Sequence, residues 1–396
     1  MLDVFGDFSA NDPAAALAEA AKGCPYQWQP ETQALYALRA GDVRQVLTSK
    51  DFWSERAPDR RAAALSEDDR QRRTKLKEFL ALWPVFSDGE HHRRVRRVAI
   101  RPLRQVVTPA LLGSWERLAG RRLAEAGEDA FDWVDHIARP LARETIAALT
   151  GSADADRLID LGGLVMNELA TSRIEMARID AALEAIDELR DWLRTALTDP
   201  PSAFVAGLAE LWDDEKFGPD SATALLTQII TGAHDPVVTA LCVAGERVTG
   251  DMLTELSPRT VREEVFRIAT PFRFASRYAR RPVTVGSHRL NTGDRIVLCL
   301  GTANLDPDFH PAPLEFRRRT TSPRSLSFGA GEHYCPGAPL AHAIVGVLLD
   351  SLADLGVHFS VENAEREPEL AMLRYRRLVG RLVRHGSSRA VPRPSS

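Results

Sequence analysis

The segment with the clearest potential for chemistry is Ser327–Ala341, which reads SFGAGEHYCPGAPLA. Two glycines and a histidine precede Cys335, and a proline and a glycine follow it at the expected start of a helix. Free backbone N–H groups and the helix dipole stabilise a thiolate at such a place, and the glycines let the backbone approach a flat ligand closely. Taken alone, this cysteine can be a nucleophile, a redox sensor, an axial metal ligand or an inert core residue.

Two pairs of charged residues have helical spacing. Glu264 and Arg267 lie three apart in EEVFR, and His92 and Arg96 lie four apart in SDGEHHRRVRRV. Residues at these spacings lie on the same side of a helix, so each pair can act as a unit. On spacing alone, the first pair could equally be a surface ion pair and the second a solvated basic face.

The stretch ITGAHDPVVTALCV, Ile230–Val243, reads as a buried helix, yet Pro236 follows His234 and Asp235 in its middle. A proline inside a helix removes one hydrogen bond and costs about 3 kcal/mol. The stretch is therefore a helix end, a tolerated kink or part of a site. Because the helical pattern continues past Pro236, we expect a helix that runs on.

Most of the sequence around these residues has the apolar spacing of helices, so helices are expected to position them. Helices are expected over Leu111–Gly127, over Phe131–Gly151 with a kink at Pro140, and from Gly218 to near Gly250. Short runs separated by GSH and NTGD predict strands between residues 277 and 300. The sequence indicates a mainly α protein with a small β portion, forming one domain over residues 1–386, with a disordered tail over residues 387–396.

Composition narrows the function classes. The net charge is −4, which argues against general binding to nucleic acid. The four cysteines form no CxxC pair, which argues against a zinc ribbon or a secreted disulfide framework. No apolar run is long enough to cross a membrane and no signal peptide is recognisable, so we expect a cytoplasmic protein.

The segment around Cys335 resembles a known signature. Its defining positions match the haem-binding motif of the cytochrome P450 (haem-thiolate) family, and the chain resembles a soluble bacterial-type member. The resemblance implies a single-domain fold in which a long distal helix and a proximal cysteine loop enclose haem b, with the Cys335 thiolate on the iron. It also implies that the other motif residues bind the cofactor: Phe328, Gly329, His333 and Gly337.

Further motifs follow in the family's order. The resemblance implies a structural network of Glu264, Arg267 and Arg319. Haem propionates are expected on the residues that match the family's propionate ligands, His92, Arg96, Arg277 and His333.

The distal helix departs from the family pattern at the place of its oxygen chemistry. The alignment places Asp235 at the usual acid and Pro236 at the usual threonine, with His234 beside them, and these three form the expected catalytic group. Proline has no hydroxyl, so proton delivery to the reacting oxygen is expected to be atypical. Three interpretations stay open: a monooxygenase using another proton source, peroxide-driven chemistry, and redox-neutral conversion of an already oxidised substrate by group transfer, cyclisation, rearrangement or dehydration.

The resemblance also implies partners. A small organic substrate of secondary metabolism, hydroxylated, oxidatively coupled or similarly oxidised, is expected, with no nucleic acid or membrane. A ferredoxin, with its reductase, is expected to dock near four arginines of one basic helix. A haem sensor or a helper protein without turnover is the alternative from another class. The docking arginines are Arg93, Arg94, Arg97 and Arg101.

Overall fold

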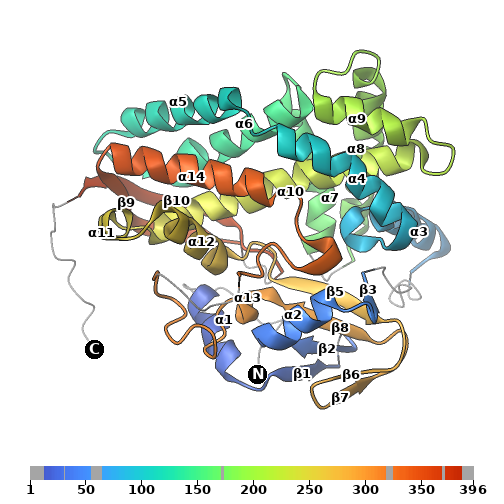
Figure 1. Cartoon of the computed structure of the whole chain (residues 1–396). Coiled ribbons are helices and arrows are strands. Elements are labelled where there is room, and N and C mark those ends of the chain that lie inside the picture. Colours follow the sequence, from blue (N-terminus) through green and yellow to red (C-terminus); the bar gives the residue numbers. More distant parts are fainter. Residues whose placement is uncertain are drawn as a thin grey trace.

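The computed structural model describes residues 13–30, 32–54, 65–170, 174–317, 324–367 and 371–385. Helices form one part of the molecule and a small, strand-rich part lies against it (Figure 1). The predicted fold class, mainly α with a small β portion, is confirmed. The expected tail over residues 387–396 lies outside the described residues.

The helical part is arranged around one long central helix, α10 (Gly218–Arg247), which runs beside α14 (Ala338–Asp354) (Figure 1). Twenty residues of α10 are buried, on all sides of the helix, as expected for a helix that crosses a core. The helices around these two are α3 (Glu67–Ala81), α4 (Gly89–Gln105), α5 (Pro109–Ala126), α6 (Arg139–Thr150), α7 (Ala155–Ala170), α8 (Met176–Ala196), α9 (Ala203–Trp212), α11 (Gly250–Glu255) and α12 (Pro258–Ala269).

Helix α10 continues through Pro236, as predicted. Most of its buried hydroxyls bond to carbonyls one turn earlier: Thr227 Oγ1 donates to Thr223 O at 2.7 Å, and Thr231 Oγ1 donates to Thr227 O at 3.0 Å. Thr239 Oγ1 donates to Leu373 O at 2.6 Å instead, so these hydroxyls place no unpaired group in the core. Pro236 cannot donate a backbone bond to Gly232 O, and this is the one carbonyl that the proline itself releases.

The strand-rich part contains a five-stranded sheet in the order β1-β2-β8-β5-β3, with β2 and β8 parallel and the other pairs antiparallel. Three short helices and a two-stranded hairpin pack near it. The sheet strands are β1 (Tyr26–Gln29), β2 (Ala34–Ala37), β3 (Phe52–Trp53), β5 (Phe274–Ala279) and β8 (Arg295–Cys299); the hairpin is β6 (Val283–Val285) and β7 (His288–Leu290); the helices are α1 (Pro13–Lys22), α2 (Ala40–Thr48) and α13 (Leu300–Ala303).

The helix expected over Phe131–Gly151 is only partly correct. The segment begins as strand β4 (Phe131–Asp132), which pairs with β10 (Tyr375–Arg384), itself paired with β9 (Val357–Arg366). A π-helical turn then leads into α6, with Pro140 in the first turn of that helix, where proline is tolerated. Pairing with a distant strand therefore overrides the local helical pattern at this end.

Candidate functional site

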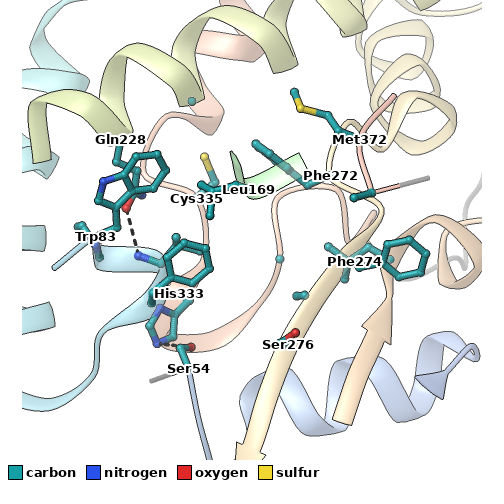
Figure 2. Close-up of a pocket in the computed structure, with 18 of the residues that line it drawn as sticks. Ser54, Trp83, Leu169, Gln228, Phe272, Phe274, Ser276, His333, Cys335 and Met372 are labelled. Atoms are coloured by element: carbon teal, nitrogen blue, oxygen red, sulfur yellow. Dashed lines mark hydrogen bonds between the residues drawn. The ribbon is translucent and has the colours of Figure 1, made fainter. Parts of the chain in front are cut away.

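A cavity of about 1640 Å³ lies between α10 and the loop that carries Cys335. It exceeds the roughly 300–1,000 Å³ of an ordinary small-molecule pocket, so it has room for a large group together with a second molecule. Figure 2 shows the Cys335 sulfur pointing into this space, with Trp83 and Gln228 on one side and Phe272 and Met372 on the other.

The loop before α14 holds Cys335 by its backbone. The Cys335 N–H donates to Phe328 O at 2.9 Å, and Gly329 and Gly331 adopt φ angles of 68° and 70°, which favour glycine. A Cβ on Gly331 would lie 2.6 Å from the backbone oxygen of Leu47, so no larger residue fits there without movement. Sequence and packing together fix the loop that presents the sulfur.

Burial dominates the electrostatics of the Cys335 thiol and raises its pKa above the ordinary value. The backbone N–H groups of Gly337 and Ala338 and the charge of Arg96 act in the opposite direction. A metal cation on the sulfur would remove the proton outright. The site therefore suits a bound metal better than a free thiolate nucleophile.

A cationic edge borders the cavity beside Cys335. Arg277 is 6% exposed, and its Nη1 donates to Ser276 O at 2.8 Å. No carboxylate of the described residues lies within ion-pair distance of it. Burial lowers the pKa of Arg277, although the charge of Asp88 opposes this. A buried guanidinium without a close counter-ion is costly, which indicates that an anion belongs beside it.

His92 and His333 stack at this edge, with ring centroids 4.2 Å apart. His333 Nε2 lies 3.1 Å from Ser54 Oγ and 3.3 Å from Asp88 Oδ1. Burial, with help from His333 and Arg96, lowers the pKa of His92 to about 4, so His92 is neutral at pH 7. Its Nδ1 makes no hydrogen bond, although it lies 3.4 Å from Glu332 Oε1. His92 is thus a neutral group at the edge of the cavity.

Glu264 and Arg267 form a buried pair on α12. Arg267 Nε and Nη2 each lie 2.9 Å from a Glu264 oxygen, and Nη1 donates to the backbone oxygen of Asn304 at 3.1 Å. Asn304 in turn accepts from Leu326 N at 2.7 Å, at the start of the cysteine loop. The pair therefore supports the loop through Asn304, and the alternative of a surface ion pair is wrong. Arg319, its expected third member, lies outside the described residues.

The distal wall is formed by α10, and Pro236 is one of its cavity-lining residues. Neither His234 nor Asp235 is among them. Asp235 Oδ1 lies 2.8 Å from His234 Nδ1, and its Oδ2 lies 2.9 Å from Arg374 Nη2. Burial opposes ionisation of Asp235, but His234 and Arg374 outweigh it and lower its pKa. The expected catalytic acid is thus held in an ion pair away from the described cavity lining.

The predicted docking arginines differ in their surroundings. Arg94 is engaged, with Nη1 3.1 Å from Glu210 Oε2. Arg93, Arg97 and Arg101 are exposed at four-residue spacing on α4, and no described carboxylate lies within ion-pair distance of them. These three form a cationic stripe on the surface.

Comparison with known proteins supports one family. A sequence model described as Cytochrome P450 matches residues 258–374, which include Cys335. The steroid C26-monooxygenase of Mycolicibacterium smegmatis is 24% identical over 79% of this chain and 75% of its own. The cyclomarin C epoxidase CymV of Salinispora arenicola is 27% identical over 67% of this chain and 71% of its own.

The fold agrees with solved structures. Epothilone D-bound cytochrome P450epoK superimposes with a TM-score of 0.78 over 95% of this chain and 98% of its own, at 18% identity. Both the sequence similarity and the fold similarity are to cytochrome P450 proteins, and the chain is an oxidoreductase whose reaction subtype is open. No helix in the described part of the chain is long and apolar enough to cross a membrane.

The residues present fit the family's cofactor, haem, which these proteins bind through a cysteine thiolate. The cavity is large enough for a macrocycle and a substrate, and Cys335 faces into it. Arg277 offers a buried positive charge, and His92 an unbonded ring nitrogen, where the carboxylates of a haem would need partners.

Sequence reasoning missed several residues of the site. Asn304 was not singled out, although its side chain joins Leu326 to Thr270. Ser54 and Gln228 were not singled out, because isolated polar residues give no signal until the fold brings them to the cavity. For Asn304, its position between a β-rich segment and the cysteine loop was the available clue.

Proposed function

We propose that this chain oxidises a small organic molecule of secondary metabolism, by hydroxylation, oxidative coupling or a similar reaction, at a haem whose iron is bound by Cys335. The observation that carries the proposal is the Cys335 sulfur, held at the start of α14 and aimed into a large cavity closed by α10. A thiolate-ligated haem supplies iron chemistry that favours O–O cleavage. The cyclomarin C epoxidase among the relatives is consistent with a role in secondary metabolism.

The proximal residues have binding roles in this proposal. Arg96 and Arg277 would be the charged partners of the haem carboxylates, while His92, neutral at pH 7, would donate to them from an unbonded nitrogen. His333 holds His92 by stacking and is itself held by Ser54 and Asp88. Phe328, Gly329 and Gly337 line the cavity and give the cofactor a close backbone surface.

Proton delivery on the distal side uses neither a threonine nor a freely exposed carboxylate. Pro236 lines the cavity without a hydroxyl, and Asp235 is paired with Arg374. A proton must therefore come from water held by the released carbonyl of Gly232, from a substrate group, or from His234 and Asp235 after rearrangement. The same observation favours a second candidate, in which peroxide or an already oxidised substrate drives the reaction.

Electron transfer in the first candidate needs a docking surface. We infer that an acidic ferredoxin, reduced by its reductase, docks on the stripe of Arg93, Arg97 and Arg101, because unpaired surface cations steer acidic partners. Arg94, already paired with Glu210, contributes less. None of the four cysteines forms a disulfide with another, which supports a reducing, cytoplasmic location.

Turnover assays separate the candidates. The reduced protein is first exposed to carbon monoxide, and the red-shifted band that gives the family its name must appear. Turnover is then compared with NADPH and the ferredoxin partners, with hydrogen peroxide, and with neither. Dependence on reductant and dioxygen supports the first candidate, whereas anaerobic turnover without reductant contradicts it and supports redox-neutral chemistry.

A further inference from the structure

Trp83 has a buried indole N–H without a protein partner. The residue lies between α3 and α4, is 2% exposed and lines the cavity. Its position is fixed, because its backbone N–H donates to Leu80 O at 3.1 Å and its ring stacks on Phe86 with centroids 6.2 Å apart. Its Nε1 makes no hydrogen bond within the described part of the chain. A buried tryptophan N–H normally finds an acceptor.

Two other fully buried tryptophans show what is particular to Trp83. Trp133 Nε1 donates to Leu241 O at 3.0 Å. Trp115 Nε1 is also without a partner, but Trp115 lies on α5 and does not line the cavity. An unpaired indole N–H is therefore not by itself a site; at Trp83, however, a bound molecule can reach the residue.

Gln228 adds a second donor beside Trp83. Its Oε1 accepts from Val85 N at 3.2 Å, which fixes the orientation of the amide and leaves Nε2 as a donor. Gln228 lies two turns before Pro236 on α10 and also lines the cavity. Figure 2 shows Gln228 and Trp83 close together at one end of the cavity.

The rest of this wall combines apolar side chains with a few charged ones. Leu80, Ile229, Ala233 and Val237 line the same cavity, as do Lys77 and the ion pair of Arg73 with Glu168, whose Nη1 and Oε1 lie 3.2 Å apart. A polar group of a bound molecule therefore gains most where Trp83 and Gln228 meet it, since few polar groups fix orientation in a mostly apolar pocket.

We propose that Trp83 and Gln228 form a two-donor subsite that binds an oxygen acceptor of the substrate, either a carbonyl or a carboxylate, and thereby orients an otherwise apolar molecule. The proposal rests on the proposed function, because it assigns the molecule in this cavity as substrate. Both donors are neutral, and both point to an acceptor rather than to a donor group on the ligand.

The subsite is tested on the haem-loaded protein by spectral binding titrations with cyclododecane, cyclododecanone and cyclododecanecarboxylate. In Trp83→Phe and in Gln228→Leu, we expect binding of the oxygenated probe, relative to the hydrocarbon, to weaken about threefold to tenfold. A loss with cyclododecanone identifies the acceptor as a carbonyl, and a loss with cyclododecanecarboxylate identifies it as a carboxylate. Trp115→Phe removes the same unpaired N–H away from the cavity and is expected to leave the ratio unchanged.

A second readout follows the indole directly. In nitrogen–proton NMR spectra of the reduced, CO-bound protein, the Trp83 signal is the one absent from Trp83→Phe. It is expected to move downfield with the oxygenated probe and not with the hydrocarbon. An unchanged signal, or equal weakening of all probes in Trp83→Phe, overturns the subsite.

Other outcomes remain distinguishable. If Trp83→Phe loosens the haem but leaves the probe ratio unchanged, the indole serves the cofactor and the subsite is overturned. If the wild type binds no haem and lacks the red-shifted CO band, the proposed function fails and the subsite fails with it. A normal band with no acceptor preference overturns the subsite alone.

Discussion

The two walls of the cavity differ in where their charges point. The proximal wall borders the cavity with Arg277, which has no ion-pair partner among the described residues, and with the unbonded nitrogen of His92. On the distal wall, Asp235 is paired with His234 and Arg374, and Pro236 faces the cavity instead.

This difference separates two kinds of binding. A buried cation without a counter-ion is unfavourable until an anion arrives, so the proximal wall is complete only with an acidic cofactor. The distal wall has already satisfied its charges within the protein. It can bind a second molecule by shape and a few neutral donors, which allows its substrate preference to change without affecting cofactor binding.

The largest expected effect comes from Cys335→Ser on the proximal wall. A serine oxygen does not replace the thiolate as an iron ligand, so the red-shifted CO band and all oxidation at the cavity should be lost. Absorption spectra of the reduced, CO-bound variant provide the measurement. Cys24→Ser, which changes an exposed cysteine outside the cavity lining, is the control and should keep both. A normal band in Cys335→Ser would show that another residue binds the iron.

The support of the proximal loop is tested by Glu264→Gln. The change leaves Arg267, 2% exposed, without its carboxylate, and breaking a buried pair costs about 3–5 kcal/mol of unfolding free energy. Urea denaturation measures the loss. Arg259→Gln on the same helix breaks an exposed pair with Glu263 and should cost about 0.5 kcal/mol or less. Equal losses in the two variants would contradict a supporting role for the buried pair.

The two walls also differ in how far the sequence predicted them. The proximal loop is a contiguous motif, so residue types and spacing located Cys335 and its glycines. On α10, the proline at position 236 marked a departure from the family pattern, and the continuation of the helix past it was predicted correctly. The direction of the Asp235 side chain was not predicted, because its partner Arg374 lies just before β10, more than a hundred residues away in sequence. The hairpin of β9 and β10 was likewise missed, since β9 ends at Arg366 and β10 begins only at Tyr375, so no short turn motif marks it in the sequence.

Arg374→Gln tests whether the distal charge is held away from the cavity. Without Arg374, the Asp235 carboxylate loses an ion-pair partner, and stability at pH 7 should fall by about 1–2 kcal/mol. The lowered pKa of Asp235 means that its stabilising contribution is present above its ordinary pKa and is lost as pH falls through the lowered value. In the variant the pKa of Asp235 rises toward its ordinary value, so the folded and unfolded states bind protons more equally and less stability is lost as pH falls.

Urea denaturation between pH 7 and pH 3 provides this measurement. Arg376→Gln, which breaks the exposed pair with Glu367 near Arg374 in sequence, is the matched control and should show neither effect. If both variants have the same pH dependence, Asp235 is not stabilised by Arg374.

The smallest expected effect comes from Pro236→Thr, which places an alcohol on the distal wall. A well-positioned proton donor contributes about 100-fold or more to a rate, but Asp235 is turned toward Arg374 and cannot relay to the new hydroxyl. We therefore expect product formed per NADPH to rise only about threefold, and further in the double variant with Arg374→Gln. Pro236→Ala restores the backbone N–H but adds no hydroxyl. Comparing it with Pro236→Thr therefore separates the effect of the restored helix hydrogen bond from the effect of a new proton donor. If all three variants match the wild type in rate, coupling and product profile, Pro236 is only a tolerated kink, and the difference between the walls has no part in the chemistry.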